Sequence, residues 1–220
     1  MTRKLQAGRK APQSGKVKSI VVLLHGYGAD GADLLGLADP LGPHLPDTLF
    51  VAPDAPEPCN GSPMGRQWFP IPWIDNSTEE AAAQGLQMAV ADVNAFLDDL
   101  LQEHGLGAQN LAVIGFSQGT MLSLEVLPRR ADPVAALVAF SGRLLRPEAL
   151  EAEVISKPPV LLVHGDQDPV VPFEDMSKAG NALVAAGFET YGHIMEGTGH
   201  GIAPDGLQVA LAFLRDKLAG

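Results

Sequence analysis

The chain has 220 residues, of which 46% are hydrophobic and 19% charged, a composition that excludes a disordered, collagen-like or coiled-coil protein. Its 26 Asp and Glu outnumber 15 Lys and Arg, and the resulting net charge of −11 disfavours nucleic acid as a partner, because phosphates are bound by Lys and Arg. Cys59 is the single cysteine, which excludes an intramolecular disulfide and fits a cytoplasmic protein. No run approaches the ~18 apolar residues of a membrane-spanning helix, so we expect no stable membrane insertion.

Residues 1–18 are basic, with six Lys or Arg and no acid. An apolar region of about 7–15 residues with a small-residue cleavage site would mark a secretory signal, and the sequence that follows has no such region. We expect a solvated, poorly ordered segment here. Residues 19–220 are expected to form one domain, since single α/β domains often reach about 200–250 residues.

From residue 19 onward, short apolar runs rich in β-branched residues alternate with helical patterns. This alternation is typical of βαβ units, and it predicts an α/β fold with a mostly parallel central sheet and helices on both faces. The expected strands are 19–24, 48–52, 111–115, 134–140, 160–164 and 189–195, and the expected helices are 79–104, 118–127, 174–186 and 206–218.

The helix expected over residues 79–104 has the clearest pattern, because its apolar side chains recur on one stripe. Ser77 and Glu80 have the spacing of a capping box at its start. The acids on this helix are expected to form a solvated face; they are Glu79, Glu80, Asp92, Asp98, Asp99 and Glu103.

The connection over residues 53–76 lacks a periodic pattern and contains Trp68, Phe69 and Trp73. Loops of this length inside a compact domain are usually functional or disordered, and the aromatic content disfavours disorder. We therefore expect the connection to form a wall of a binding site. Packing of these rings onto the sheet is the competing interpretation.

Residues 115–119, Gly-Phe-Ser-Gln-Gly, fit the pattern G-x-S-x-G between a predicted strand and a predicted helix. In that context a sharp turn lifts the serine oxygen out of the sheet, and the glycines permit the strained backbone. A serine hydroxyl is a poor nucleophile until a base removes its proton. A histidine and an acid that orients it should therefore follow Ser117 in the chain.

Two acids, Asp166 and Asp168, follow the fifth predicted strand. Ligands bind at the carboxyl ends of the strands in open α/β sheets, which favours this loop as the source of the acid. Of the six histidines, His200 lies in a glycine-rich turn after the last predicted strand, from which it could reach Ser117. The order serine, acid, histidine is that of α/β hydrolases.

A serine hydrolase also needs backbone N–H groups that stabilise the oxyanion formed when the acyl carbonyl becomes tetrahedral. Gln118, directly after Ser117, should supply one donor. The second should come from the loop after the first predicted strand, where residues 25–28 read His-Gly-Tyr-Gly.

Residues 26–31 also fit G-x-G-x-x-G after a strand, and Asp54 stands 23 residues beyond Gly31. This is the fingerprint of a dinucleotide site, so an NAD(P)-binding oxidoreductase is an alternative. It leaves Ser117 and His200 unexplained, whereas a hydrolase accounts for the glycines as part of an oxyanion loop. A further alternative to an enzyme is a ligand receptor that has the hydrolase fold but converts little substrate.

The sequence resembles the carboxylesterase/phospholipase family of α/β hydrolases, which includes the acyl-protein thioesterases. The matching segments extend from the first predicted strand to the last predicted helix; they are 24–30, 68–69, 115–119, 164–172 and 199–200. Two positions depart from the family pattern and concern the shape of the acyl site. Pro70 stands where an aspartate often follows the aromatic pair, and Thr120 replaces a frequent glycine.

The resemblance implies an α/β-hydrolase fold, and a length of 220 residues leaves little room for a large cap domain. It assigns Ser117 as the nucleophile, Asp168 rather than Asp166 as the acid, and His200 as the base. The backbone N–H groups of Tyr27 and Gln118 would form the oxyanion hole, and Trp68 and Phe69 would line the acyl groove. Trp73, in the same connection, is a further candidate for substrate contact, which its aromatic ring suggests.

The function expected is cleavage of a small-molecule carboxylic ester, thioester or lysophospholipid through an acyl-enzyme, with no cofactor and no metal. The sequence does not determine the length of the acyl chain, the leaving group or the oligomeric state. A homodimer is one possible assembly.

Overall fold

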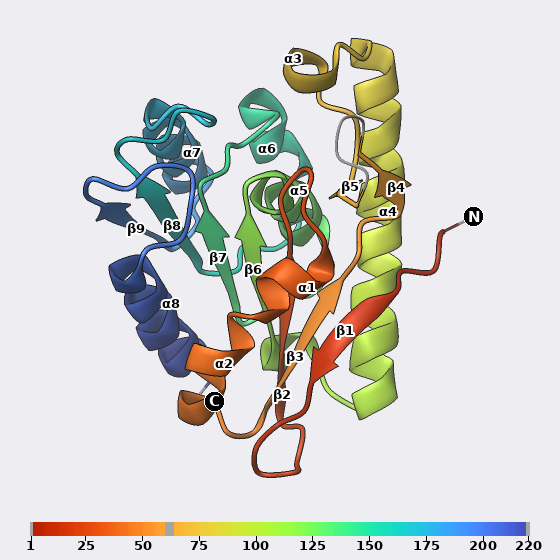
Figure 1. Ribbon diagram of the computed structural model, residues 1–220, viewed down its shortest axis with the longest axis vertical. Helices are drawn as coiled ribbons and strands as arrows, with labels where there is room; N and C mark the ends of the chain where they lie inside the picture. The colour runs from red at the N-terminus through yellow and green to blue at the C-terminus, as the bar shows by residue number, and fades with distance from the viewer. Residues whose placement is uncertain (1, 60–63, 219–220) are drawn as a thin grey trace.

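The structure, a computed structural model, describes residues 2–59 and 64–218. A seven-stranded sheet forms its centre (Figure 1), with the strand order β1-β3-β2-β6-β7-β8-β9. Among the described strands of this sheet, only β1 is antiparallel to its neighbour, so the predicted α/β fold with a mostly parallel sheet is confirmed. The strands are β1 (Ala7–Lys10), β2 (Ser19–Leu24), β3 (Thr48–Pro53), β6 (Leu111–Phe116), β7 (Ala136–Phe140), β8 (Val160–Gly165) and β9 (Thr190–Met195).

Helices cover both faces of this sheet, because successive strand residues point to opposite sides. Val22 and Leu24 belong to one buried cluster, and Val21 and Leu23 belong to the other. The first cluster lies under α4 (Glu79–His104), α5 (Gln118–Val126), α6 (Pro147–Glu153) and α7 (Glu174–Ala185), and we call this side the α4 face. The second lies under α1 (Gly31–Leu35), α2 (Ala38–Leu41) and α8 (Pro204–Lys217), and we call it the α8 face.

Helix α4 has the predicted bounds, but its capping residue and its acids differ from the prediction. The cap is Thr78, whose side chain accepts a hydrogen bond from the Ala81 N–H, in place of Ser77. Asp92 is 2% exposed, so the acids of α4 do not all lie on a solvated face. Within the described residues, no helix is long and apolar enough to cross a membrane.

The N-terminal segment corrects the expectation of a poorly ordered tail. Strand β1 pairs antiparallel with β3, and Leu5 is buried in the core. Arg3 donates from its N–H and from Nε to the two carboxylate oxygens of Asp92, at 2.7 and 2.6 Å. Arg3 and Arg9 therefore pair with acids on α4, whereas Lys10 and Lys18 pair with Asp39 and Asp47, so much of the positive charge that suggested solvation is locally compensated.

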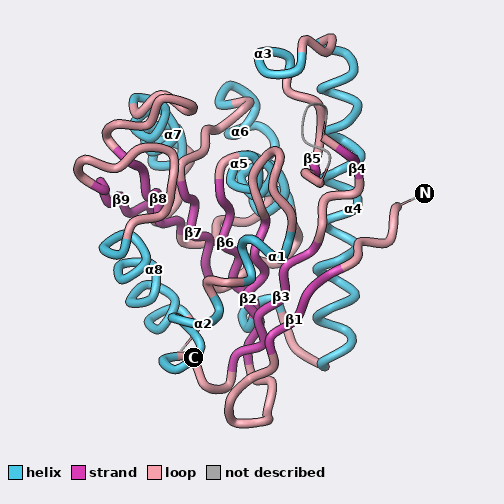
Figure 2. Tube along the Cα trace, in the orientation of Figure 1, coloured by secondary structure: helices cyan, strands magenta, loops and turns pink. Residues whose placement is uncertain are grey.

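The connection between β3 and α4 rises above the carboxyl ends of the strands. Most of it is loop (Figure 2), interrupted by β4 (Glu57–Pro58), β5 (Arg66–Gln67) and α3 (Pro72–Asp75), and its residues 60–63 lie outside the described residues. The segment between β7 and β8, which contains α6, rises above the same edge (Figure 1). In the described parts of the chain, these two short segments stand where a cap domain would lie.

Candidate active site

The turn at Ser117 is a strained link between a strand and a helix. Ser117 has φ 52° and ψ −113°, in the left-handed half of the Ramachandran plot that non-glycine residues rarely adopt. Its N–H donates to the Phe140 carbonyl at 2.9 Å, and its own carbonyl accepts from the Met121 N–H at 3.1 Å. Only a glycine fits at Gly119, because a Cβ there would lie 1.8 Å from the Leu24 carbonyl oxygen. The turn is therefore fixed by its neighbours, as a nucleophile elbow requires.

Asp168 lies in the loop after β8 and its carboxylate is fully bonded. Oδ1 accepts from the N–H groups of Val170 and Val171 at 2.8 and 2.9 Å, and Oδ2 accepts from His200 Nδ1 at 2.7 Å. Burial acts to raise the pKa of Asp168, but the hydrogen bonds from His200 and from the two N–H groups outweigh it and hold the pKa below its usual value. Asp168 is therefore a carboxylate that stays ionised while it orients an imidazole.

His200 stands between this carboxylate and the elbow. Its ring lies against the ring of Phe116, with 5.0 Å between centroids, and Phe116 directly precedes Ser117. Because Nδ1 is engaged by Asp168, the free ring nitrogen is Nε2. The structure thus pairs His200 with Asp168 and places the His200 ring against the residue that precedes Ser117.

Three other polar residues at this edge of the sheet hold loops in place, namely Asp166, His25 and His164. Asp166 accepts a hydrogen bond from the Gly197 N–H at 2.7 Å, so it holds the loop that carries His200. His25 donates from Nδ1 to the Gly26 carbonyl at 2.8 Å and accepts from the Ala55 N–H at Nε2. Burial lowers the pKa of His25, which favours the neutral ring that this pattern needs. His164 Nε2 lies 3.0 Å from the Val171 carbonyl oxygen.

Tyr27 and Gln118, the two residues expected to donate to the oxyanion, lie in a loop beside the elbow and directly after it. Gln118 begins α5, and the first N–H groups of a helix have no partner within that helix. The loop of Tyr27 reaches the elbow, since a Cβ at Gly26 would lie 3.2 Å from Ser117 Cβ. It is fixed from the other side, because the Gly28 N–H donates to the Arg66 carbonyl and the Arg66 N–H donates to the Ala29 carbonyl.

The side chain of Gln118, which the sequence analysis did not use, ties the β3–α4 connection to the elbow. Its Oε1 accepts from the Trp68 N–H at 2.9 Å, and its Nε2 donates to the Phe69 carbonyl at 2.7 Å. A carboxamide suits this position because it accepts and donates at once.

The three aromatic residues expected to contact substrate are placed differently from one another. Trp68 and Phe69 are 0% and 3% exposed and pack in the core of the α4 face. The indole N–H of Trp68 donates to the His25 carbonyl at 2.9 Å. Trp73, on α3, is 55% exposed and lies under the guanidinium of Arg143. The structure therefore places only the Trp73 side chain where a substrate has access to it.

Arg143 and Asp75 border this region and were missed from the sequence. Asp75 Oδ2 accepts a hydrogen bond from the Tyr27 hydroxyl at 3.4 Å, so α3 is linked to the oxyanion loop. Arg143 follows the carboxyl end of β7, a position that could have flagged it, but no motif contains it.

The glycine loop of the alternative dinucleotide site is filled by the chain itself. The Gly31 N–H donates to Asp54 Oδ1 at 2.9 Å, so the acid that would bind a ribose is engaged. A Cβ at Gly31 would lie 2.5 Å from the Ala52 carbonyl oxygen, which shows that this glycine serves close packing.

A mostly parallel sheet with an elbow at Ser117 and an Asp168–His200 pair at the same edge defines an α/β hydrolase. Residues 10–218 match the phospholipase/carboxylesterase family, and the chain belongs to that family of hydrolases.

Proteins of similar sequence and similar structure support membership of this family. Esterase YpfH of Escherichia coli K12 is 29% identical, over 90% of this chain and 82% of its own length. Acyl-protein thioesterase 1 of Kluyveromyces lactis is 28% identical, over 97% of this chain and 98% of its own. The crystal structure of esterase PE8 superimposes with a TM-score of 0.93 at 46% identity, covering 98% of this chain and 100% of that one. None of these relatives favours the oxidoreductase alternative.

Proposed function

We propose that the chain hydrolyses carboxylic esters or thioesters through an acyl-enzyme on Ser117. The observation that carries the proposal is the His200–Asp168 hydrogen bond of 2.7 Å, with the His200 ring resting on the residue that precedes Ser117. This arrangement of base, orienting acid and strained serine is what nucleophilic catalysis by a hydroxyl needs.

In the first step, Ser117 Oγ attacks the acyl carbonyl carbon as His200 Nε2 takes the hydroxyl proton. The carbonyl oxygen becomes an oxyanion that accepts hydrogen bonds from the N–H groups of Tyr27 and Gln118. Asp168 holds the imidazole and stabilises its charged form. When the tetrahedral intermediate collapses, the bond to the leaving oxygen or sulfur breaks and that atom receives the proton from His200.

Water then repeats the sequence on the acyl-enzyme. His200 takes a proton from the water, the hydroxide attacks the acyl carbon, and Ser117 leaves with that proton returned. No step calls for a redox or electrophilic group beyond these side chains.

The names of the relatives support this choice of substrate class, because one relative is an esterase and two others are acyl-protein thioesterases. We propose a small-molecule ester or thioester as the substrate, with lysophospholipids as a further candidate. A cytoplasmic location, a single domain over residues 19–220 and a homodimer stay predictions.

Labelling with a fluorophosphonate probe, followed by mass spectrometry of the peptides, tests the nucleophile. We expect one adduct, on Ser117, and Ser117→Ala should lower kcat by about 10⁶-fold if the triad acts as a unit. Near-normal turnover of that variant, or an adduct on another residue, would exclude the proposed mechanism.

A further inference from the structure

We propose that Trp68 is a positioning residue, whose indole fixes the Tyr27 N–H relative to the Gln118 N–H in the oxyanion hole. Trp68 is fully buried, so its side chain acts on the site from outside the reach of a substrate. The inference rests on the proposed function, because it concerns how the two oxyanion donors of that mechanism are held in place.

The main chain at Trp68 is bound to the elbow through the side chain of Gln118. Gln118 is fully buried, and its carboxamide accepts from the Trp68 N–H at 2.9 Å and donates to the Phe69 carbonyl at 2.7 Å. Two hydrogen bonds of opposite direction fix both the position and the orientation of this short segment. Helix α4 holds it from the other side, since a Cβ at Gly85 would lie 3.2 Å from Phe69 Cβ. The residue that supplies the first oxyanion donor therefore also anchors Trp68.

The side chain of Trp68 extends from this anchor to the oxyanion loop. Its indole N–H donates to the His25 carbonyl at 2.9 Å, and the indole and imidazole rings are 5.2 Å apart between centroids. The same carbonyl lies close to the first turn of α5, because a Cβ at Gly119 would be 2.9 Å from its oxygen. Trp68 thus contacts both the main chain and the ring of His25.

His25 in turn fixes the peptide that carries the second donor. Its Nδ1 donates to the Gly26 carbonyl at 2.8 Å, and its Nε2 accepts from the Ala55 N–H at 3.0 Å, so the ring is held on both sides. The Gly26 carbonyl and the Tyr27 N–H belong to one planar trans peptide, in which they point in opposite directions. A Gly26 carbonyl bound to the His25 ring therefore directs the Tyr27 N–H away from that ring.

These contacts form a closed path between the two donors. The path starts at the Gln118 residue, passes through the backbone and indole of Trp68, and reaches the Tyr27 N–H through His25. An oxyanion donor is useful only within hydrogen-bond distance of the oxygen, and its contribution falls steeply when its direction changes. Removal of a whole donor costs about 10²- to 10³-fold in kcat, so we expect a misplaced donor to cost about 10- to 100-fold.

Trp68→Phe and Gln118→Met test the two ends of this path. Trp68→Phe removes the indole N–H and keeps an aromatic ring, whereas Gln118→Met removes both side-chain hydrogen bonds and keeps the backbone N–H. With p-nitrophenyl butyrate, each variant should lower kcat by about 10- to 100-fold and leave KM within about threefold, because the oxyanion forms only on the way to the transition state. The inhibition constant of a trifluoromethyl ketone, whose adduct with Ser117 carries an oxyanion, should rise by a similar factor.

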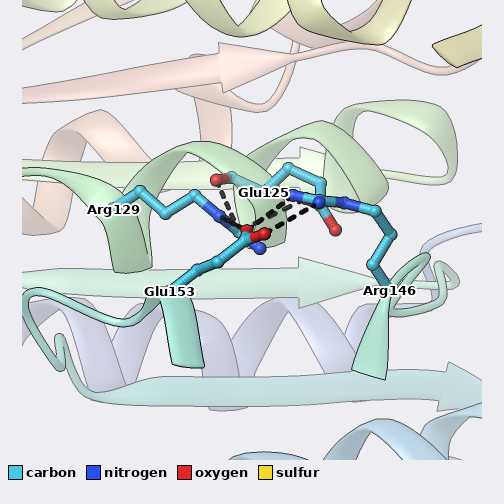
Figure 3. Close-up of polar contacts among 4 residues, drawn as sticks. All are labelled: Glu125, Arg129, Arg146 and Glu153. Atoms are coloured by element: carbon cyan, nitrogen blue, oxygen red, sulfur yellow. Dashed lines mark hydrogen bonds and ion pairs between the residues drawn. The ribbon is translucent and has the colours of Figure 1, made fainter. Parts of the chain in front are cut away.

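Glu125→Gln is the matched control, because it changes a buried polar side chain at the opposite end of helix α5 from Gln118. Glu125 is 1% exposed, and its Oε2 accepts from Arg146 Nη2 at 2.8 Å. Figure 3 shows that Arg146 also binds Glu153, at 2.9 Å, in a four-residue cluster completed by Arg129. Loss of a buried charge beside these cations should lower the urea midpoint of unfolding, while kcat, KM and the inhibition constant stay within about twofold of the native values.

The proposal is overturned if either variant, with a native circular dichroism spectrum, keeps kcat within about threefold of the native value. A rise in KM at unchanged kcat would also overturn it, since that result would show that Trp68 contacts the substrate. An equal loss of kcat in Glu125→Gln would show that any disturbance of α5 has the same effect, which contradicts a positioning role.

Fluorophosphonate labelling of the native enzyme separates this inference from the proposed function. If the native enzyme forms the Ser117 adduct and the variants keep their kcat, only the positioning role of Trp68 fails. If the native enzyme forms no adduct on Ser117, the proposed mechanism itself fails.

Discussion

Replacing Asp168 by asparagine tests the orientation of the base with almost no change of shape. In the native protein, Oδ1 faces two backbone donors, the N–H groups of Val170 and Val171, and Oδ2 faces His200 Nδ1. An asparagine has one oxygen and one NH₂ group. The two N–H donors will hold the amide oxygen at the Oδ1 position, because the opposite orientation would place the NH₂ group against both of them. The NH₂ group then faces His200.

An NH₂ group at that position donates to Nδ1, so His200 carries its proton on Nε2. In that tautomer Nε2 cannot accept the proton of Ser117, and the expected loss in kcat is about 10⁴-fold. At 1.36 kcal/mol for each factor of ten, this loss corresponds to about 5 kcal/mol of transition-state stabilisation. The assay is the hydrolysis of p-nitrophenyl butyrate, with circular dichroism to confirm the native fold.

Asp166→Asn is the matched control, since Asp166 accepts a hydrogen bond from a loop N–H, that of Gly197, and has no described contact with His200. We expect it to change kcat by less than about threefold, because asparagine keeps an oxygen that can accept from the same N–H. A loss of less than tenfold in Asp168→Asn would refute the orientation argument. A larger loss in Asp166→Asn than in Asp168→Asn would show that the acid is the other carboxylate.

Two further predictions concern stability. Asp92→Ala should lower the free energy of unfolding in urea by about 1–3 kcal/mol, since it removes two hydrogen bonds from Arg3; a change below about 0.5 kcal/mol would contradict this. Burial acts to raise the pKa of Asp175, but the hydrogen bonds from Lys178 and Arg143 outweigh it and hold the pKa below its usual value. The Asp175 carboxylate stabilises the fold above about pH 4, and this contribution is lost as the pH falls through its lowered pKa. Asp175→Asn should therefore make stability depend less on pH in the acid range, as followed by circular dichroism. An unchanged dependence of stability on pH would contradict this prediction.

Much of the fold and of the proposed triad could be predicted because the signals are local. The apolar stripe of α4 lies within one continuous segment, and the helix has the predicted bounds. The elbow needs a strand, a small turn and a helix in direct succession, and residues 111–126 supply them. His200 and Asp168 follow the ends of strands, and parallel strands bring their carboxyl ends to one edge.

The N-terminal segment shows where local signals end. Its six basic residues suggested solvation, but Arg3 pairs with Asp92, which lies 89 positions away in the chain. No periodicity within residues 1–18 encodes that partner. Strand β1 forms because the edge of β3 is free to pair, and that is a property of the assembled sheet.

Composition and charge excluded classes of protein and partner, and the G-x-S-x-G motif with its later acid and histidine indicated the chemistry. The same sequence could not say that Trp68 is fully buried while Trp73 is exposed, nor that Arg143 stands over the Trp73 ring. The type of a side chain is a local property, whereas its access to substrate depends on which distant segments pack against it. The residues of the proposed triad could therefore be predicted from the sequence, whereas the exposure of the side chains around the site depends on the tertiary structure.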